Sequence, residues 1–198
     1  MSAPTKPPII LASRSPRRRE LLQQAGYSFV VVPPDERAEC GICSGESPSQ
    51  FAARLAYQKA ANVASKIKEG LILACDTVVS CDGNILGKPR DEDDARRILH
   101  LLRGKQHSVL TGVCVWDYPN SAPRVQVAET RLVMSHLTDE EIEEYLASGL
   151  WEGKAGAFGY QDRLGWLHII EGSESNVVGL PMELLDRIIS DLVRSRES

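Results

Sequence analysis

The stretch LILACDTVVS at positions 71–80 is an apolar run, rich in β-branched residues, that carries a single carboxylate at Asp76. A run of this length and composition predicts a buried strand. The dipeptide Asp82-Gly83 follows as a hairpin turn signal and leads into a second short strand at 84–86. The sequence therefore predicts a strand over 71–80 that a tight turn connects to a second, short strand.

Asp76 is the exceptional residue of this run. A buried carboxylate is costly unless it meets a hydrogen-bond donor, a cation or a metal. A structural Asp at a turn or strand end is one interpretation, and a functional acid is the other. We favour function, because Lys88 and the basic segment 14–19 can serve as partners.

Strand and helix patterns alternate along the rest of the chain, which predicts an α/β fold. Further strands are predicted at 9–12, 29–32, 107–116, 124–135 and 166–170. Helices are predicted at 16–25, from Ser47 to about 67, at 91–102, 138–147 and 181–194. Capping boxes begin the second and fourth of these helices. Segments 33–46 and 153–165 are interpreted as loops.

Composition narrows the class of protein. A formal net charge of −4 argues against a polyanionic partner such as nucleic acid. No apolar run approaches the ~18 residues of a membrane span, and the Pro-rich residues 1–8 form a loose leader rather than a secretory signal. Five cysteines, an odd number, fit a reducing cytosol. We therefore expect a cytoplasmic protein without a membrane or nucleic-acid partner.

Three basic features point to an anion. The segment 13–19 places two hydroxyls and several guanidinium groups at a predicted helix start, where unpaired N–H groups favour phosphate; a solvated basic turn is the alternative. Lys59 falls in the middle of an apolar helix stripe, where it must either extend to solvent or meet an anion. Segment 83–89 is not a P-loop, because its glycine spacing differs and Pro89 stands where Ser or Thr is needed. Lys88, just past the hairpin, could still reach a phosphate as a point charge; a surface lysine is the alternative.

Cys40 and Cys43 form a lone CxxC pair within a predicted loop. Without a second pair it is a weak signal for zinc, and redox pairs usually open a helix. We interpret the pair as structural or incidental, with a thiol or zinc module as the alternative. The four histidines show no metal-binding spacing, and no G-x-S-x-G elbow is present.

Taken in order, these segments resemble the Maf family over residues 9 to 185. The matching pieces are Leu11-Ala12-Ser13-Arg14-Ser15-Pro16-Arg17-Arg18, Glu20-Leu21-Leu22, Arg54-Leu55-Ala56, Lys59-Ala60, Asp76-Thr77-Val78-Val79, Gly87-Lys88-Pro89, Thr111-Gly112-Val113, Lys154-Ala155-Gly156-Ala157-Phe158-Gly159, Gln161 and Val178-Gly179-Leu180-Pro181. No single piece is decisive, but the ordered set is highly specific.

The resemblance implies one elongated, Maf-like (ITPase-like) domain over 9–195, with a central mixed sheet flanked by helices and two lobes around a cleft. It implies hydrolysis of a nucleoside triphosphate to monophosphate and pyrophosphate with Mg²⁺ or Mn²⁺, and commonly a homodimer. Asp76 matches the family's catalytic proton acceptor. The phosphate site is matched by Ser13, Arg17, Arg18, Lys59 and Lys88.

Base preference follows from three further positions. Members of the dTTP/UTP type carry Arg, Thr and Gln there, and this chain has Arg17, Thr77 and Gln161. The resemblance thus implies dTTP and UTP, with some modified pyrimidine nucleotides, as substrates. A 7-methyl-GTP type enzyme, or a nucleotide-binding regulator of cell division without significant turnover, remains the alternative.

The expected metal site departs from the family pattern. The family usually shows an acidic pair after the second strand, and ungapped counting places that pair on Arg37 and Ala38. Asp35, Glu36 and Glu39 are adjacent, and a one-residue shift makes Glu39 the equivalent. We therefore expect Asp76 and Glu39 to hold the metal, since Mg²⁺ needs only one or two carboxylates beside waters and substrate oxygens.

Overall fold

A computed structural model describes residues 8–35, 38, 41, 43, 45–162 and 164–196. Its strands are β1 (Ile9–Leu11), β2 (Phe29–Val31), β3 (Gly70–Cys81), β4 (Asn84–Leu86), β5 (Gln106–Tyr118), β6 (Arg124–Met134) and β7 (Leu167–Glu171). Its helices are α1 (Pro16–Gln24), α2 (Pro48–Ala64), α3 (Glu92–Leu102), α4 (Asp139–Ala147), α5 (Glu174–Val178) and α6 (Met182–Arg196). Two short 3₁₀ turns, η2 (Ala155–Ala157) and η3 (Tyr160–Asp162), precede β7.

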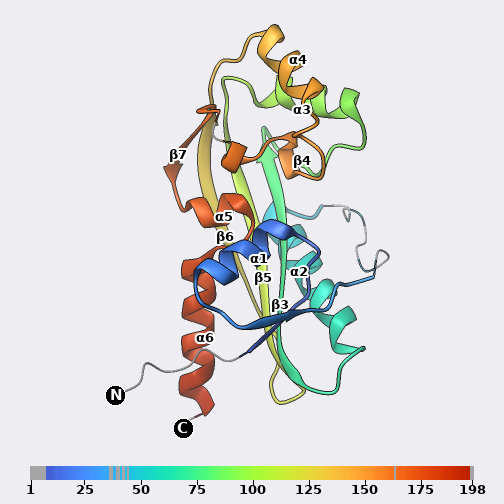
Figure 1. Cartoon of the computed structure of the whole chain (residues 1–198), viewed down its shortest axis with the longest axis vertical. Coiled ribbons are helices and arrows are strands. Elements are labelled where there is room, and N and C mark those ends of the chain that lie inside the picture. The colour runs from blue at the N-terminus through green and yellow to red at the C-terminus, as the bar shows by residue number, and fades with distance from the viewer. Residues whose placement is uncertain are drawn as a thin grey trace.

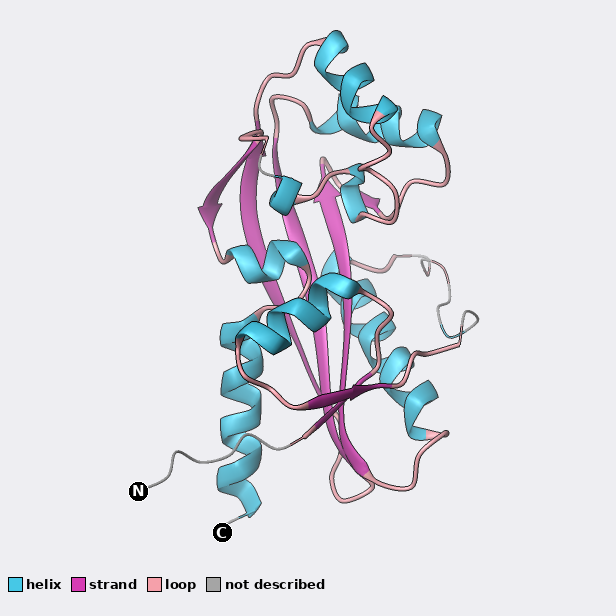
Figure 2. Cartoon of the chain, in the orientation of Figure 1, coloured by secondary structure: helices cyan, strands magenta, loops and turns pink. Residues whose placement is uncertain are grey.

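The seven strands form one mixed sheet in the order β2-β1-β3-β5-β6-β7, with β4 paired to β3 (Figures 1 and 2). The β1 strand runs parallel to β2 and β3, whereas all the other pairs are antiparallel. The long strands β3, β5 and β6 run along the long axis of the molecule, and α3 and α4 lie beyond their upper ends, as Figure 1 shows. The α/β class and the mixed sheet predicted from the sequence are confirmed.

Side-chain alternation along β3 distributes the core over both faces of the sheet. Ile72 and Ala74 pack with the apolar stripe of α2. Leu71 and Leu73 point to the opposite face and pack with α1 and α6. Because both faces are covered, β3 is buried along nearly its whole length, which explains its continuous apolar sequence.

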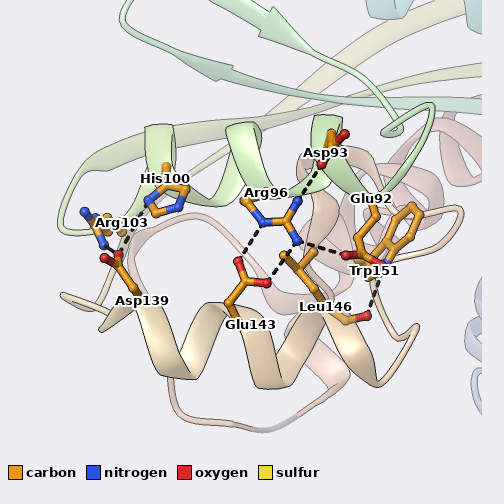
Figure 3. A network of polar contacts seen from close by, with 9 residues as sticks. All are labelled: Glu92, Asp93, Arg96, His100, Arg103, Asp139, Glu143, Leu146 and Trp151. Carbon is orange, nitrogen blue, oxygen red and sulfur yellow. Dashed lines mark hydrogen bonds and ion pairs between the residues drawn. The ribbon is translucent and has the colours of Figure 1, made fainter.

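The upper lobe is built by α3 and α4 over the far ends of the long strands (Figure 1). A separate apolar cluster that includes Leu99, Leu132 and Ile142 holds it together. Figure 3 shows the polar contacts at its surface, where Arg96 of α3 donates to Glu143 of α4 at 2.6 Å. Exposed ion pairs of this kind contribute little to stability, so the apolar cluster is what mainly stabilises this lobe.

The predicted strands and helices are present, with boundaries shifted by a few residues at most. Both capping boxes form, at Ser47 with Gln50 and at Thr138 with Glu141. The sequence analysis missed α5 and the two 3₁₀ turns. The predicted leader lies mostly outside the described residues, which begin at Pro8.

Candidate active site

The candidate site lies at a gap in the strand pairing of β3. On one edge, β3 pairs with β1 over residues 71–73 and with β4 over residues 79–81. Within the described chain, no strand pairs with residues 74–78 on that edge. A cavity of about 450 Å³ opens there, in the size range of small-molecule sites.

The cavity brings together every predicted substrate-binding and catalytic residue. Its lining includes Ser13, Arg17, Arg18, Lys59, Asp76, Thr77, Lys88 and Gln161. These side chains come from the β1–α1 segment, from α2, from β3 and from the two segments that precede α3 and β7. The folding of the chain thus gathers these dispersed positions in one cavity, where Asp76 is the only buried acid among the described lining residues.

Asp76 forms an ion pair with Lys59. The Lys59 Nζ donates to Asp76 Oδ1 at 2.5 Å, and the two residues are only 7% and 8% exposed. The strand places Asp76 on the face that α2 covers, and the helical period places Lys59 opposite it. Of the two interpretations of Lys59, contact with an anion is therefore correct, and the partner of Asp76 is Lys59 rather than Lys88 or the basic segment.

Arg18 is buried beside the gap in the pairing of β3 and connects the segments around it. Its guanidinium donates to the carbonyl oxygens of Gly179 at 2.7 Å and Cys75 at 2.9 Å. It also donates to Ser13 Oγ and Thr77 Oγ1, both at 3.1 Å. Since buried backbone carbonyls need partners, Arg18 takes the place of the missing strand at Cys75. Most of its donors are thus committed to positioning the cavity wall.

Thr77 belongs to a chain of hydroxyl contacts. Its Oγ1 lies 3.0 Å from Thr111 Oγ1, and Thr111 donates to the Asn176 carbonyl oxygen at 3.2 Å. A hydroxyl has one hydrogen, so Thr77 must donate to Thr111 while it accepts from Arg18. The Thr77 side chain is therefore held rigidly at the cavity wall.

Arg17 and Gln161 line the cavity but make no hydrogen bonds of this kind within the described chain. Among the described residues, neither side chain has a hydrogen-bond partner, and Arg17 is half-buried while Gln161 is exposed. Burial lowers the pKa of the Arg17 guanidinium, and the neighbouring Arg18 adds to that effect. The guanidinium nevertheless stays protonated, because the pKa of arginine lies far above neutral pH. Both side chains are thus available to a ligand.

A buried ion pair supports the Gln161 side of the cavity, and the sequence analysis did not single it out. Lys154 Nζ donates to both carboxylate oxygens of Asp162 at 2.6 Å. The Tyr145 hydroxyl donates to Asp162 at 2.8 Å, and burial together with this carboxylate raises the pKa of Tyr145 well above its usual value. The contacts fix the turn that carries Gln161.

Comparison with known proteins identifies the family of the chain. The family model described as Maf-like protein matches residues 8–192. The chain belongs to the Maf-like protein family. It is 53% identical to a dTTP/UTP pyrophosphatase of Rhodopirellula baltica, over 98% of this chain and 86% of that protein. It is 42% identical to a dTTP/UTP pyrophosphatase of Ruminiclostridium cellulolyticum, over 93% of this chain and 95% of that protein.

The fold of this Maf-like protein also resembles that of a solved structure. A HAM1 protein from Coxiella burnetii superposes with a TM-score of 0.50 at 14% identity, covering 93% of this chain and 98% of that one. The likeness concerns the fold alone. None of the described helices combines the length and apolar character that a bilayer-spanning segment needs.

The predicted metal ligands of this Maf-like protein are only partly visible. Asp76 lines the cavity, and within the described residues its Oδ2 accepts no hydrogen bond. Glu39 lies outside the described residues. Asp35 is exposed and pairs with Lys66 at 2.8 Å. No cluster of three or more metal-ligating side chains occurs in the part of the chain that the structure describes.

The CxxC hypothesis stays untested. Cys43 is a free, exposed thiol, and Cys40 lies outside the described residues. Cys75, Cys81 and Cys114 are free and buried.

Proposed function

We propose that this Maf-like protein hydrolyses dTTP and UTP, and some modified pyrimidine nucleotides, to the monophosphate and pyrophosphate. The observation that carries the proposal is the buried Lys59–Asp76 pair at the edge of a cavity lined by further cationic side chains. Relatives that are 42–53% identical over nearly the whole chain are dTTP/UTP pyrophosphatases, which supports the reaction and the substrates.

In this proposal the phosphates of the substrate bind at the β1–α1 segment. Residues 13–18 line the cavity where α1 begins, and the first N–H groups of a helix favour an anion. Arg17 and Lys88 supply positive charge from two sides. Charge that develops on the pyrophosphate leaving group would be offset by these fixed cations.

Asp76 is the proposed proton acceptor. Its Oδ1 is held by Lys59, and this contact orients the carboxylate so that Oδ2 remains available to the attacking water. Lys59 compensates the charge of Asp76 and lines the same cavity, where it also contacts phosphate in this proposal. Arg18 keeps Cys75, the preceding residue of β3, in place and so positions Asp76.

We propose that a divalent cation such as Mg²⁺ or Mn²⁺ binds in the cavity, because Asp76 lines it and its Oδ2 accepts no hydrogen bond within the described residues. Asp76 would hold it together with an acidic residue of 35–39, for which Glu39 is the choice from the sequence. Mg²⁺ prefers one or two carboxylates, with waters and phosphate oxygens completing the shell, so a small protein ligand set suffices. When bound, the ion would supply Lewis-acid stabilisation of phosphate charge and lower the pKa of a bound water.

The cytosolic location and the homodimer are part of the same proposal. Free thiols at Cys43, Cys75, Cys81 and Cys114 are consistent with a reducing compartment. The homodimer rests on the family resemblance, and sedimentation equilibrium tests it.

A panel of nucleoside triphosphates tests the function by release of pyrophosphate with Mg²⁺, Mn²⁺ or no metal. We expect turnover of dTTP and UTP and at least a ~100-fold loss in Asp76→Asn, as for other essential acid–base groups. Asp82→Asn is the matched control. Asp82 pairs with Lys105 at 2.7 Å on the surface, and its φ of 48° is readily adopted by Asn.

Two results would contradict the proposal. Undiminished pyrophosphate release by Asp76→Asn would remove the assigned role of that carboxylate. Tight nucleotide binding without turnover on any triphosphate would show a regulator rather than an enzyme.

A further inference from the structure

The part of the cavity that is lined by strands β5 and β6, which we call its inner part, is mostly apolar. The lining residues contributed by β5 and β6 are His107, Val109, Leu132 and Met134. Val79 of β3 and Phe158 add further apolar surface. Among the four lining residues from β5 and β6, His107 alone is polar, and it is only 5% exposed. A flat, mostly apolar ligand group such as a nucleobase suits this part of the cavity.

The hydrogen-bonding state of His107 follows from its contact with the backbone. Its Nδ1 lies 3.2 Å from the Lys105 carbonyl oxygen, which can only accept, so Nδ1 carries a hydrogen. Burial lowers the pKa of His107, which favours the neutral ring. The other nitrogen, Nε2, then has a lone pair, and no hydrogen bond to it is found within the described residues.

An acceptor in this position discriminates between bases. Thymine and uracil carry an N3–H donor between two carbonyl oxygens, whereas N3 of cytosine is an acceptor. A lone pair on a buried ring nitrogen matches the former and opposes the latter. A buried polar group left without its partner is costly, and sites built on such a group reject analogues that cannot pair with it.

We propose that His107 is a specificity-determining residue whose Nε2 accepts a hydrogen bond from N3–H of thymine or uracil. This inference rests on the proposed function, because it assigns the base to the inner part of the same cavity. Gln161, which lines that cavity, would supply an amide donor for one of the two flanking carbonyl oxygens. Together with His107 it would match two adjacent positions of the acceptor–donor–acceptor edge that these two bases present.

A purely structural role is the competing interpretation. The His107 ring sits opposite Leu132 in the strand register, and its Nδ1 contact ties down the turn before β5. Loss of that role would lower activity on every substrate by the same factor. Base discrimination therefore separates the two interpretations, whereas activity on one substrate does not.

The experiment compares kcat/KM for UTP, CTP and N3-methyl-UTP. We expect the wild-type protein to prefer UTP over N3-methyl-UTP by at least ~10-fold, since one hydrogen bond of about 1.4 kcal/mol corresponds to that factor. In His107→Asn the shorter amide can keep the Lys105 contact but has no atom near Nε2, so the preference should fall to within about threefold. His107→Gln, whose amide oxygen reaches farther, should restore part of it.

His168→Asn is the control, because His168 is an exposed histidine on β7 that does not line the cavity. It should leave both activity and preference unchanged. Thermal unfolding of each variant shows whether it is folded. If His107→Asn does not fold, the preference of the wild-type protein and that of His107→Gln still test whether His107 discriminates between the bases.

Equal use of UTP and N3-methyl-UTP by the wild-type protein would overturn the inference, and so would an unchanged preference in folded His107→Asn. Failure of the proposed function has a different signature, which is absence of turnover on all triphosphates. In that case, calorimetric binding of UTP and N3-methyl-UTP to the same variants measures the discrimination without catalysis. Equal affinities there would again overturn the inference.

Discussion

Replacement of Lys59 by Met tests whether the Lys59–Asp76 pair behaves as a buried ion pair. The substitution keeps the length of the side chain and removes its charge. Nζ and Oδ1 are 2.5 Å apart, and the side chains are 9% and 11% exposed. Removal of one partner from a buried pair costs about 3–5 kcal/mol, because the remaining charge is left without compensation. Since Asp76 borders a cavity that can admit water, we expect the lower end, about 3 kcal/mol.

For a chain of 198 residues this loss corresponds to a melting temperature lower by roughly 6–12 °C. Urea unfolding gives the free energy, and a double-mutant cycle with Asp76→Asn isolates the pair. The double variant removes both charges of the pair, so it should be more stable than the sum of the single losses predicts, by about 1–3 kcal/mol.

The surface pair Lys105–Asp82 provides a matched cycle. Its Nζ–Oδ2 distance is 2.7 Å, similar to that of the buried pair, but its side chains are 44% and 59% exposed. A cycle of Lys105→Met with Asp82→Asn should show no resolvable coupling, because solvent screens exposed charges. Additivity within about 0.5 kcal/mol in the Lys59–Asp76 cycle would refute our reasoning about burial.

Three further predictions follow from the cavity wall and its surroundings. Arg18→Lys should lower the free energy of unfolding in urea by about 2 kcal/mol, because an ammonium cannot replace a planar donor with four contacts. Gly179→Ala should cost about 1–3 kcal/mol and reduce kcat/KM for UTP, since Gly179 has a φ of 113° and a Cβ there would lie 3.2 Å from Thr77 Oγ1. Burial raises the pKa of Cys75 from 9.0 to about 11 and that of Cys114 to about 12. Between pH 9 and 11 these thiols ionise only in the unfolded chain, so the free energy of unfolding should fall as pH rises through this range. Replacement of both residues by alanine should make the free energy of unfolding less dependent on pH.

Most of the fold could be predicted because local signals agree with tertiary packing. The capping boxes at Ser47 and Thr138 and the alternating or continuous apolar runs place most elements within a few residues of their observed limits. Helix α5 could not be found in this way. It has five residues, too few for a helical period, and is held by tertiary contacts from Asn176 to the Val109 carbonyl and Thr130.

The residues that line the site could be predicted from the sequence, but the contacts between them could not. The sequence indicates that Asp76 needs a partner, yet several cations were available, and only the packing of α2 on β3 selects Lys59. The Lys154–Asp162 pair gives no comparable signal, because both residues fall in a glycine-rich stretch without periodicity. His107 likewise has no motif spacing, and the orientation of its ring determines its chemistry.

The pairing gap in β3 connects the stability of the molecule with its proposed chemistry. An unpaired strand edge exposes a backbone carbonyl that must be satisfied, and at Cys75 a guanidinium does this instead of a strand. A side chain occupies less of the edge than a strand would, so space remains beside Asp76 for a triphosphate. The same Arg18 contacts Gly179 and Thr77, which fixes the wall on the side of α5. We therefore expect variants of Arg18 to lose stability and substrate affinity together. Variants of Arg17, which has no hydrogen-bond partner in the described chain, should lose affinity without a loss of stability.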